Sequence, residues 1–460
     1  MQRRAFLFQT AAQALGWSLF ALPRTTSAAV ADSADPADPA MARRKLVVVM
    51  LRGAVDGLSV VAPYAEPAYL AARPTLALPG PGAEGGVIRL TELFGLHPAL
   101  ARLAPYWAQG SLSFVHASGS PDSTRSHFDA QDFMESGTPG RKSTPDGWMN
   151  RLLSDLPGAA SPTRAISMGA LPARIFSGPA SVASLGLGPR AFEGKAIDDP
   201  QVQAMLDKLY GAAGQGGRAA AAPGRVNDQA LARTYRAATE GRSEIQRSMA
   251  ASMTSDSAAS AAAGAGAGMS TAAAGRAADP TADNGAPSAR SFAADAKRLG
   301  SLIRRDAHTQ LAFTSVGGWD THVNQGGSQG QLANRLASLG EGLDALAQGL
   351  GEALRDTVIV VMSEFGRTVH QNGNQGTDHG RGNVMWLLGG PVAGGRVLGE
   401  WPGLDTAALV DGRDLAVTTD FRHVLASLLQ RHLGVSDAGL GRVFPNLPGR
   451  WPGEAGLLRV

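Results

Sequence analysis

Two segments of the chain place an acidic residue beside a histidine within a glycine-rich loop. Asp320 and His322 follow two glycines and lie two residues apart, so an extended backbone directs both side chains to the same side. Asp378 and His379 are adjacent and are also framed by glycines. Carboxylate oxygens and imidazole nitrogens together suit zinc, manganese or another divalent ion such as magnesium or calcium. These two pairs are therefore the first candidates for a metal site.

Two further acidic residues, Asp56 and Glu364, follow segments that we predict to be strands. They are additional candidate ligands. A single Asp after a strand also commonly forms a turn or caps a helix, so both roles remain open for Asp56. Isolated histidines are expected to be structural, and these are His97, His370 and His423.

The segment around Ser126 combines a predicted helix start with positive charge. Ser126 and Asp129 lie three residues apart, which is the spacing of a helix N-cap. A helix N-terminus also favours an anion, so Ser126 is a candidate cap and a candidate nucleophile. Three arginines near these motifs could hold a phosphate or sulfate, namely Arg125, Arg367 and Arg381. An ordinary surface role is the alternative, because arginine supplies most of the positive charge of this chain.

The elements that would position these residues are short apolar strands and amphipathic helices. Continuous apolar runs predict strands buried on both faces, at residues 45–51, 112–116, 311–316, 357–362 and 384–388. Leucines spaced by three and four residues between Leu332 and Leu354 predict a helix that packs on the core. This alternation predicts an α/β fold, a three-layer sandwich with a mainly parallel sheet.

Ligands bind such sheets at the carboxyl ends of the strands. The loops that carry Asp56, the Asp320–His322 pair and Glu364 each follow a predicted strand, and the loop with Asp378 and His379 leads into one. We therefore expect six side chains to converge on one cation or two adjacent ones, with Ser126 close by. The six are Asp56, Asp320, His322, Glu364, Asp378 and His379.

The chain begins with features of an export signal. Arg3 and Arg4 precede a short apolar stretch and then small residues, which is the order of a twin-arginine signal peptide over residues 1–31. A proline-punctuated acidic linker covers 32–43, and a single domain is expected over 44–448. An Ala-, Gly- and Ser-rich insertion interrupts it at about 212–290, where too few apolar side chains are present to offset the ordering entropy. The expected location is periplasmic or secreted, and the expected partner is the twin-arginine export machinery.

Composition excludes several classes of protein. The chain has no cysteine, so it has neither disulfides nor thiolate metal sites. Setting aside residues 1–29, which hold three arginines and no acid, leaves 42 minus 3, or 39, basic residues against 39 acidic ones. This balance argues against a nucleic-acid partner. No other stretch has the roughly 18 apolar residues of a membrane span, so none is expected in the mature protein.

The export signal and five motifs occur in a fixed order along the chain: RGAVDGLS, DSTRSHFDAQDFMESGTPG, GGWDTH, SEFGRT and TDHGRGN. Together they closely resemble the exported bacterial family known as domain of unknown function 1501. The resemblance runs from about Lys45 to Leu447. That family is similar to the alkaline phosphatase and sulfatase superfamily, which implies an alkaline phosphatase-like α/β fold with metal ions at the strand ends.

The resemblance also implies roles for particular residues. Asp56 matches a metal-binding Asp after the first strand, and Asp320 with His322 resembles an Asp and His pair after a later one. Glu364 takes the place of a ligating Asp, but Phe365 stands where a ligating His would follow. His379, together with Asp378, resembles the last ligands, and Ser126 stands for the nucleophile. Phe365 therefore leaves open whether the site holds two metals, one metal, or a metal without turnover.

Three functions follow from these residues. The first is a metal-dependent hydrolase of phosphate or sulfate esters, acting on a small anionic ester or a surface glycan. The second is a non-catalytic exported binding or assembly protein with a degenerate site. The third is a serine hydrolase built on Ser126, which the absence of a Gly-x-Ser-x-Gly motif around that residue disfavours.

Overall fold

A nine-stranded sheet forms the centre of the computed structural model, which describes residues 39–157, 161–169, 172–188, 282–449 and 451–459. From one edge to the other, the strands are β11 (Arg396–Leu398), β5 (Leu112–Gly119), β10 (Asn383–Leu388), β9 (Thr357–Ser363), β1 (Lys45–Leu51), β8 (Leu311–Val316), β6 (Ala165–Met168) and β7 (Ala183–Leu185), with β12 (Thr419–Asp420) also paired to β5.

The sheet is mixed but mostly parallel. β1 lies between β8 and β9 and runs parallel to both, and β6 and β7 continue this direction. β10 is antiparallel to both of its neighbours, β9 and β5. The predicted α/β class with a mainly parallel sheet is therefore confirmed. The reversal of β10 brings the loop before it to the sheet edge where the parallel strands end.

Strand β1 shows why these sequences form a buried sheet. All seven residues of KLVVVML are buried, and successive side chains point to opposite faces. Val47, Val49 and Leu51 belong to one hydrophobic cluster, and Leu46, Val48 and Met50 belong to another. A strand that serves two cores needs apolar residues at every position, which is why its sequence does not alternate.

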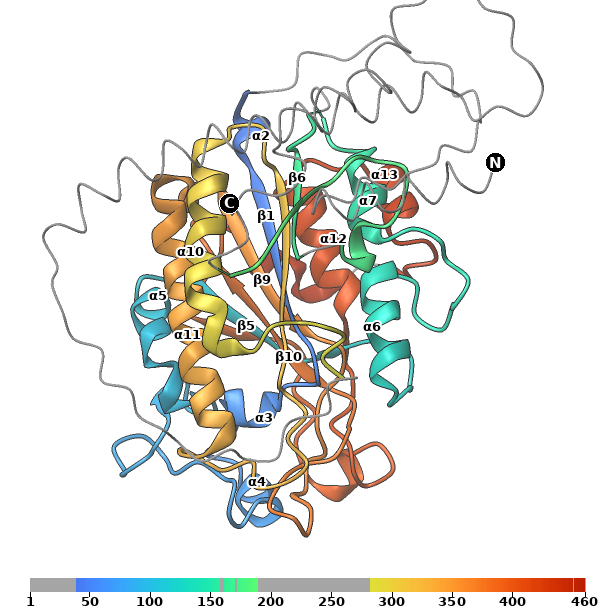
Figure 1. Ribbon diagram of the computed structural model, residues 1–460. Helices are drawn as coiled ribbons and strands as arrows, with labels where there is room; N and C mark the ends of the chain where they lie inside the picture. Colours follow the sequence, from blue (N-terminus) through green and yellow to red (C-terminus); the bar gives the residue numbers. More distant parts are fainter. Residues whose placement is uncertain (1–38, 158–160, 170–171, 189–281, 450, 460) are drawn as a thin grey trace, which may run out of the picture.

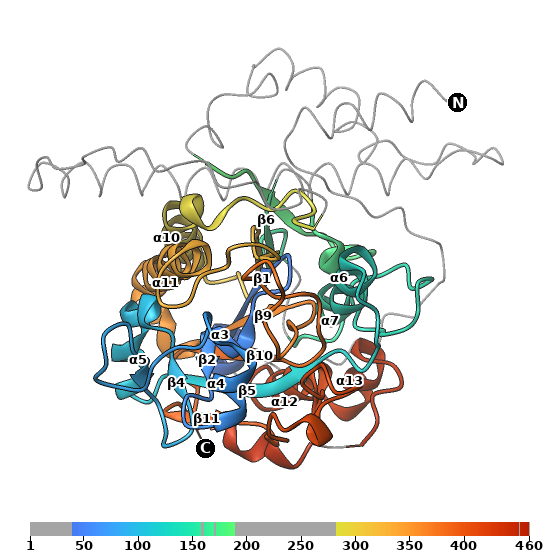
Figure 2. The same ribbon diagram turned by 90° about the horizontal axis from the view of Figure 1, so that it is seen from below.

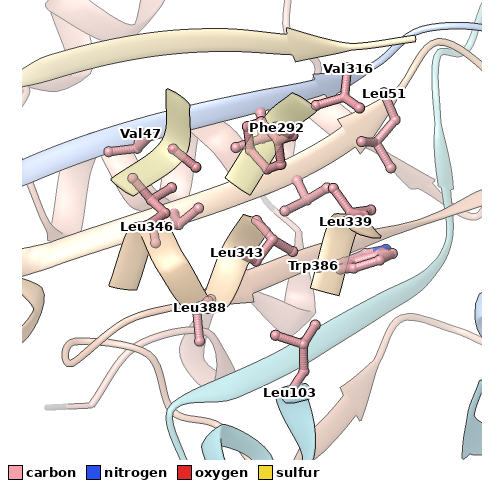
Figure 3. Packing of buried hydrophobic residues seen from close by; sticks show 14 of the residues in the cluster. Val47, Leu51, Leu103, Phe292, Val316, Leu339, Leu343, Leu346, Trp386 and Leu388 are labelled. Carbon is pink, nitrogen blue, oxygen red and sulfur yellow. The ribbon is translucent and has the colours of Figure 1, made fainter. Parts of the chain in front are cut away.

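Helices cover both faces of the sheet (Figures 1 and 2). One layer contains α10 (Ala289–Arg305), α11 (Gln331–Leu350), the 3₁₀ helix η1 (Pro98–Leu103) and α5 (Ala104–Ala108). The other contains α6 (His127–Ser136), α7 (Trp148–Leu153), α12 (Phe421–Arg431) and α13 (Asp437–Val443). Leu339, Leu343 and Leu346 of α11 pack towards the sheet beside Phe292 of α10 (Figure 3), so the leucine repeat is core, as expected.

The remaining elements are short. A three-stranded sheet contains β2 (Val61–Ala62), β4 (Gly95–Leu96) and β3 (Ile88–Arg89). The short helices are α2 (Pro39–Arg43), α3 (Gly57–Val60), α4 (Pro67–Ala72), η2 (Arg174–Phe176), η7 (Gly351–Asp356), η8 (Thr406–Ala408) and η9 (Pro452–Gly456). The helix predicted through Leu354 ends at Leu350, because Gly351 has a φ of 51° and continues into the 3₁₀ helix η7.

The signal peptide predicted over 1–31 and most of the linker and insertion lie outside the described residues. Residues 282–290 of the predicted insertion are described, and they form a turn, a bridge from Ser288 to Gly317 and the start of α10. Among the described residues, no helix combines the length and apolar character that crossing a membrane requires.

Candidate metal centre

Three imidazoles and one carboxylate converge at the edge of the sheet where β8 and β9 end. The Oδ1 atom of Asp320 lies 3.0 Å from Nε2 of His322, 3.2 Å from Nε2 of His379 and 3.5 Å from Nε2 of His127. Asp320 and His322 follow β8, His379 precedes the reversed strand β10, and His127 is the first residue of α6. Four side chains from three separate segments therefore meet around one point.

The second nitrogen of each imidazole is held by an acceptor. The Nδ1 partners lie 2.8 to 2.9 Å away and are Glu364 Oε1 for His127, Asp378 Oδ1 for His322 and the Arg125 carbonyl oxygen for His379. A hydrogen on each Nδ1 satisfies these acceptors and leaves the Nε2 lone pair of a neutral ring free. Metal-binding histidines in proteins are commonly held by such partners.

The spacing of the Nε2 atoms fits a cation between them. The Nε2 atom of His379 lies 3.0 Å from that of His127 and 3.0 Å from that of His322. Unprotonated lone pairs that face one another at this distance repel. Ligands placed 2.0–2.1 Å from a tetrahedral zinc ion lie roughly 3.3 Å apart, which is close to the distances of 3.0 to 3.5 Å among the ligand atoms of His127, Asp320 and His379. The chemistry of His127, Asp320 and His379, with His322 beside them, thus fits a divalent metal.

The electrostatics of the cluster also favour a positive charge at this point. Burial alone lowers the pKa of His127, but hydrogen bonds with Asp320 and Glu364 outweigh it and raise that pKa to about 9. Contact with Asp320 raises the pKa of His322. The pKa of Asp320 is held far below its usual range, because its three imidazole contacts and Arg367 outweigh its burial. Either bound protons or a metal cation would offset the negative charge of Asp320 and Glu364 at this point.

Glu364 and Asp378 lie around the ligands rather than among them. Oε1 of the fully buried Glu364 accepts from His127, from the Gly53 amide at 2.8 Å and from Gln131 at 3.0 Å. Asp378 accepts from His322 and from Asn372. The ligand role expected for these two carboxylates is therefore replaced by a role in orienting two of the imidazoles.

Asp56 does not join the cluster, which corrects the expectation that it is a ligand. Its carboxylate is fully buried and forms a two-point contact with Arg73, at 2.6 Å and 3.0 Å. Ser59 and Gln325 also donate to it. The positive charge that a metal would have supplied comes from the Arg73 guanidinium, which is itself fully buried.

Arg367 also has a different role from the anion clamp that we expected. Its guanidinium is buried and donates to Asp320 at 2.6 Å and to the carbonyl oxygens of Gly53, Ala54 and Trp319. With its hydrogens directed to these acceptors, it orients Asp320 and ties together the loops after β1 and β8.

The aromatic ring of Phe365 packs against the site without ligating. Its centroid lies 4.9 Å from that of His127 and 5.1 Å from that of His379. Phe365 also clusters with Ala54 and Ala130, so it forms an apolar wall behind two imidazoles.

The comparison with known families matches this chain over residues 43–445 to a family described as a protein of unknown function (DUF1501). The chain belongs to the DUF1501 family. Among curated proteins, no relative matches it. The match covers every described residue of the cluster, so the cluster lies wholly within the DUF1501 region.

His127 is a candidate ligand in this DUF1501 protein that the sequence alone did not reveal. It directly follows Ser126, whose side chain accepts from the Asp129 amide at 3.4 Å and caps α6. The cap interpretation of Ser126 was therefore correct. One feature of the sequence does point to His127. It begins a predicted helix after a predicted strand, and the other ligands are also expected beyond strand ends.

Ser126 and the two remaining arginines lie at the rim of the site. The serine is exposed, and its neighbours on both sides contact the cluster, Arg125 through its carbonyl oxygen and His127 through its imidazole. The side chain of Arg125 pairs with Asp414 at 2.7 Å. Arg381 differs, because its Nε is buried without a hydrogen-bond partner in the described part of the chain.

Proposed function

We propose that this DUF1501 protein is a metal-dependent hydrolase of phosphate or sulfate esters with an alkaline phosphatase-like fold. One observation supports it above the others: the Nε2 atoms of His127, His322 and His379 all lie within 3.5 Å of Oδ1 of Asp320, and the Nδ1 atom of each ring has its own hydrogen-bond partner. His127, Asp320, His322 and His379 would hold the cation. The three imidazoles favour zinc over manganese, magnesium or calcium, which prefer oxygen ligands.

A divalent cation at this position would polarise the ester and lower the pKa of an attacking hydroxyl or water. We assign the attack to the Ser126 hydroxyl, because this residue lies between two residues that contact the cluster and is exposed to solvent. The N-terminus of α6 would favour the negative charge that develops on its oxygen. The exposed fraction of the His322 side chain, 37%, indicates that solvent reaches the site from this side.

Arg381 is the arginine that we assign to binding the anionic group of the substrate. Arg381 lines a small hollow with Thr124 and Phe365, and its buried Nε has no hydrogen-bond partner among the described residues. A buried guanidinium hydrogen without an acceptor is costly, and an anionic oxygen would satisfy it. A small anionic ester or a surface glycan carrying such a group fits this chemistry.

The N-terminal twin arginines Arg3 and Arg4 support a further part of the proposal, namely export through the twin-arginine machinery to the periplasm or beyond. Exchange of both residues for lysine is then expected to block export. Normal appearance of the double variant outside the cytoplasm would refute this part without touching the proposed chemistry.

A non-catalytic binding or assembly protein is the second candidate, and one observation favours it. Phe365, which cannot bind a metal, packs against His127 and His379 at the position where a further ligand would stand in a two-metal hydrolase site. In this case the cation would stabilise the junction of three segments without turning over an ester.

The decisive experiment starts from protein purified without a histidine tag. Metal content is measured first, and the protein is then assayed on phosphate and sulfate esters with zinc, manganese, magnesium or calcium added. Bound metal with metal-dependent ester hydrolysis supports the hydrolase. The lack of any metal binding refutes the hydrolase, and bound metal without hydrolysis supports the second candidate.

A further inference from the structure

The side-chain amide of Gln325 lies at the centre of a fully buried polar network behind the candidate metal centre. Its Oε1 lies 2.8 Å from the Thr321 hydroxyl and 2.7 Å from the Thr377 hydroxyl. Its Nε2 lies 2.7 Å from Oδ2 of Asp56. The side chain is completely shielded from solvent, so water does not substitute for any of these contacts.

The hydrogen-bond directions in this network are fixed by Asp56. The contact with Arg73 and the donated hydrogen bonds outweigh burial and lower the pKa of Asp56, which therefore only accepts hydrogen bonds. Gln325 must then donate from Nε2 to Asp56, and its Oε1 accepts from both threonine hydroxyls. Each polar group finds its partner in one arrangement, so the amide has a single orientation.

The two threonines belong to the two loops that carry most of the ligands. Thr321 lies between the ligands Asp320 and His322, and Thr377 lies two residues before the ligand His379. The Thr377 amide also donates to the Thr321 carbonyl oxygen at 3.2 Å. A single side chain thus joins both loops at positions one or two residues from their ligands.

The close approach of these loops depends on a glycine. A Cβ atom at Gly376 would lie 2.3 Å from the carbonyl group of His322, which a side chain cannot tolerate. Between the same two loops, the backbone N–H of Gln325 donates to the Gln375 carbonyl oxygen at 2.9 Å. The backbone contact sets how near the loops lie, and the Gln325 side chain sets their register and links them to Asp56.

We propose that Gln325 is a positioning residue for the metal centre: it holds the Asp320–His322 loop and the His379 loop in the geometry that binds the cation. The Asp56–Arg73 pair anchors it, since Arg73 also donates to the carbonyl oxygens of Thr368 and Val369. This inference rests on the proposed metal site. It gives Asp56 a structural function in place of ligation.

The test compares Gln325→Met with Asn150→Leu. Methionine keeps the length of the side chain but removes its hydrogen bonds with Thr321, Thr377 and Asp56 and a longer one, of 3.4 Å, to the Ser59 hydroxyl. Asn150 is a matched control, because it is an equally buried amide with hydrogen bonds to Phe176 and Ala180, in the α7 layer away from the cluster. The readouts are the zinc dissociation constant, measured by competition with a chelator, and the rise in Tm on adding zinc.

Both variants are expected to lower the Tm of the metal-free protein. Only Gln325→Met should raise the zinc dissociation constant, by about 10- to 100-fold, as seen for changes to residues around metal ligands. It should also reduce the zinc-induced rise in Tm. An unchanged dissociation constant in this variant, or an equal change in Asn150→Leu, would overturn the proposal.

A milder variant covers the case in which Gln325→Met does not fold. Thr377→Val removes one hydroxyl donor from the same amide and should raise the zinc dissociation constant several-fold, in the same direction. If the wild-type protein binds no zinc or manganese, the proposed function itself fails and this inference fails with it. If the wild-type protein binds metal, and Gln325→Met and Thr377→Val bind it as tightly as the wild type does, only the positioning role is refuted.

Discussion

Each histidine of the candidate metal centre has one nitrogen committed to a protein acceptor and one directed at the common point. His127 is the most informative of them, because it links the cluster to the buried Glu364. Changes to residues around metal ligands typically lower metal affinity by about 10- to 100-fold. We predict a larger loss of zinc affinity in His127→Ala, because this variant removes a proposed direct ligand. Chelator competition measures this.

The matched control for that variant is His308→Ala. His308 is exposed and lies between α10 and β8, at the opposite end of β8 from Asp320. Its removal should leave zinc affinity unchanged. Equal zinc affinity in His127→Ala and the wild type would show that the convergence of the four side chains does not bind metal.

The pH dependence of metal binding follows from the raised pKa of His127, which lies at about 9 in the metal-free protein. Because this value exceeds the unfolded pKa of about 6.5, protonation stabilises the metal-free fold below about pH 6.5, and that contribution is lost as pH rises through about 9. A metal must displace the same proton. Zinc affinity should therefore rise about tenfold per pH unit for each proton displaced, and His127 should stop contributing to this slope above about pH 9.

Titrations of zinc binding between about pH 6 and pH 9 measure this slope, and buffers of different ionisation enthalpy count the protons released. In His127→Ala the slope should be shallower by one proton. A slope that is the same in the variant and the wild type would contradict the assigned role of His127.

The sequence predicted part of this site at the level of single residues, and the misses have a physical cause. Asp320, His322 and His379 were identified because acid and imidazole lie side by side in glycine-rich loops. Asp56 was assigned as a ligand because nothing local shows that Arg73, 17 residues later, neutralises it. His127 was missed because the direction of its side chain depends on where α6 starts relative to β8 and β10.

At the scale of elements, the reversed strand β10 explains how the ligands meet. The loops after β8 and β9 lie at the carboxyl edge, and a parallel β10 would have placed His379 at the other end of the sheet. Continuous apolar sequences predicted five strands to within a few residues. They do not encode strand direction, and strands as short as β6 and β7 give too little pattern to recognise.

The start of α6 allows the cap and nucleophile roles of Ser126 to be separated. Asparagine is as good an N-cap as serine, so Ser126→Asn should retain the Tm of the wild type, whereas Ser126→Ala should lose about 1 kcal/mol of stability. If the proposed hydroxyl attack is right, both variants should lose at least about 100-fold in kcat on an ester substrate while retaining the metal. Ester assays with metal analysis measure this.

The zinc content of both variants serves as the internal control, because neither change removes a ligand. Wild-type turnover by Ser126→Asn would refute the serine as nucleophile and would leave a metal-activated water as the attacking group.

At the scale of the whole molecule, strands from both sides of the insertion alternate in one sheet. β1 lies between β8 and β9, and β5 pairs with β10, so residues 39–188 do not form a sheet independent of residues 282–449 (Figure 1). The interleaving could not be predicted, because strand order is set by packing between distant segments.

This interleaving predicts the outcome of cutting the chain at a protease site introduced between residues 189 and 281. The two fragments should remain associated on size exclusion, because separating them would expose both hydrophobic faces of β1. Metal should strengthen the association, since His127 comes from one fragment while Asp320, His322 and His379 come from the other. The denaturant concentration that separates the fragments should therefore rise when zinc is added, by linkage between binding and association.

The same cut in His127→Ala is the control and should show a much smaller rise. Fragments that separate without denaturant would refute the shared sheet, and an equal effect of zinc in both proteins would refute a metal site that bridges them.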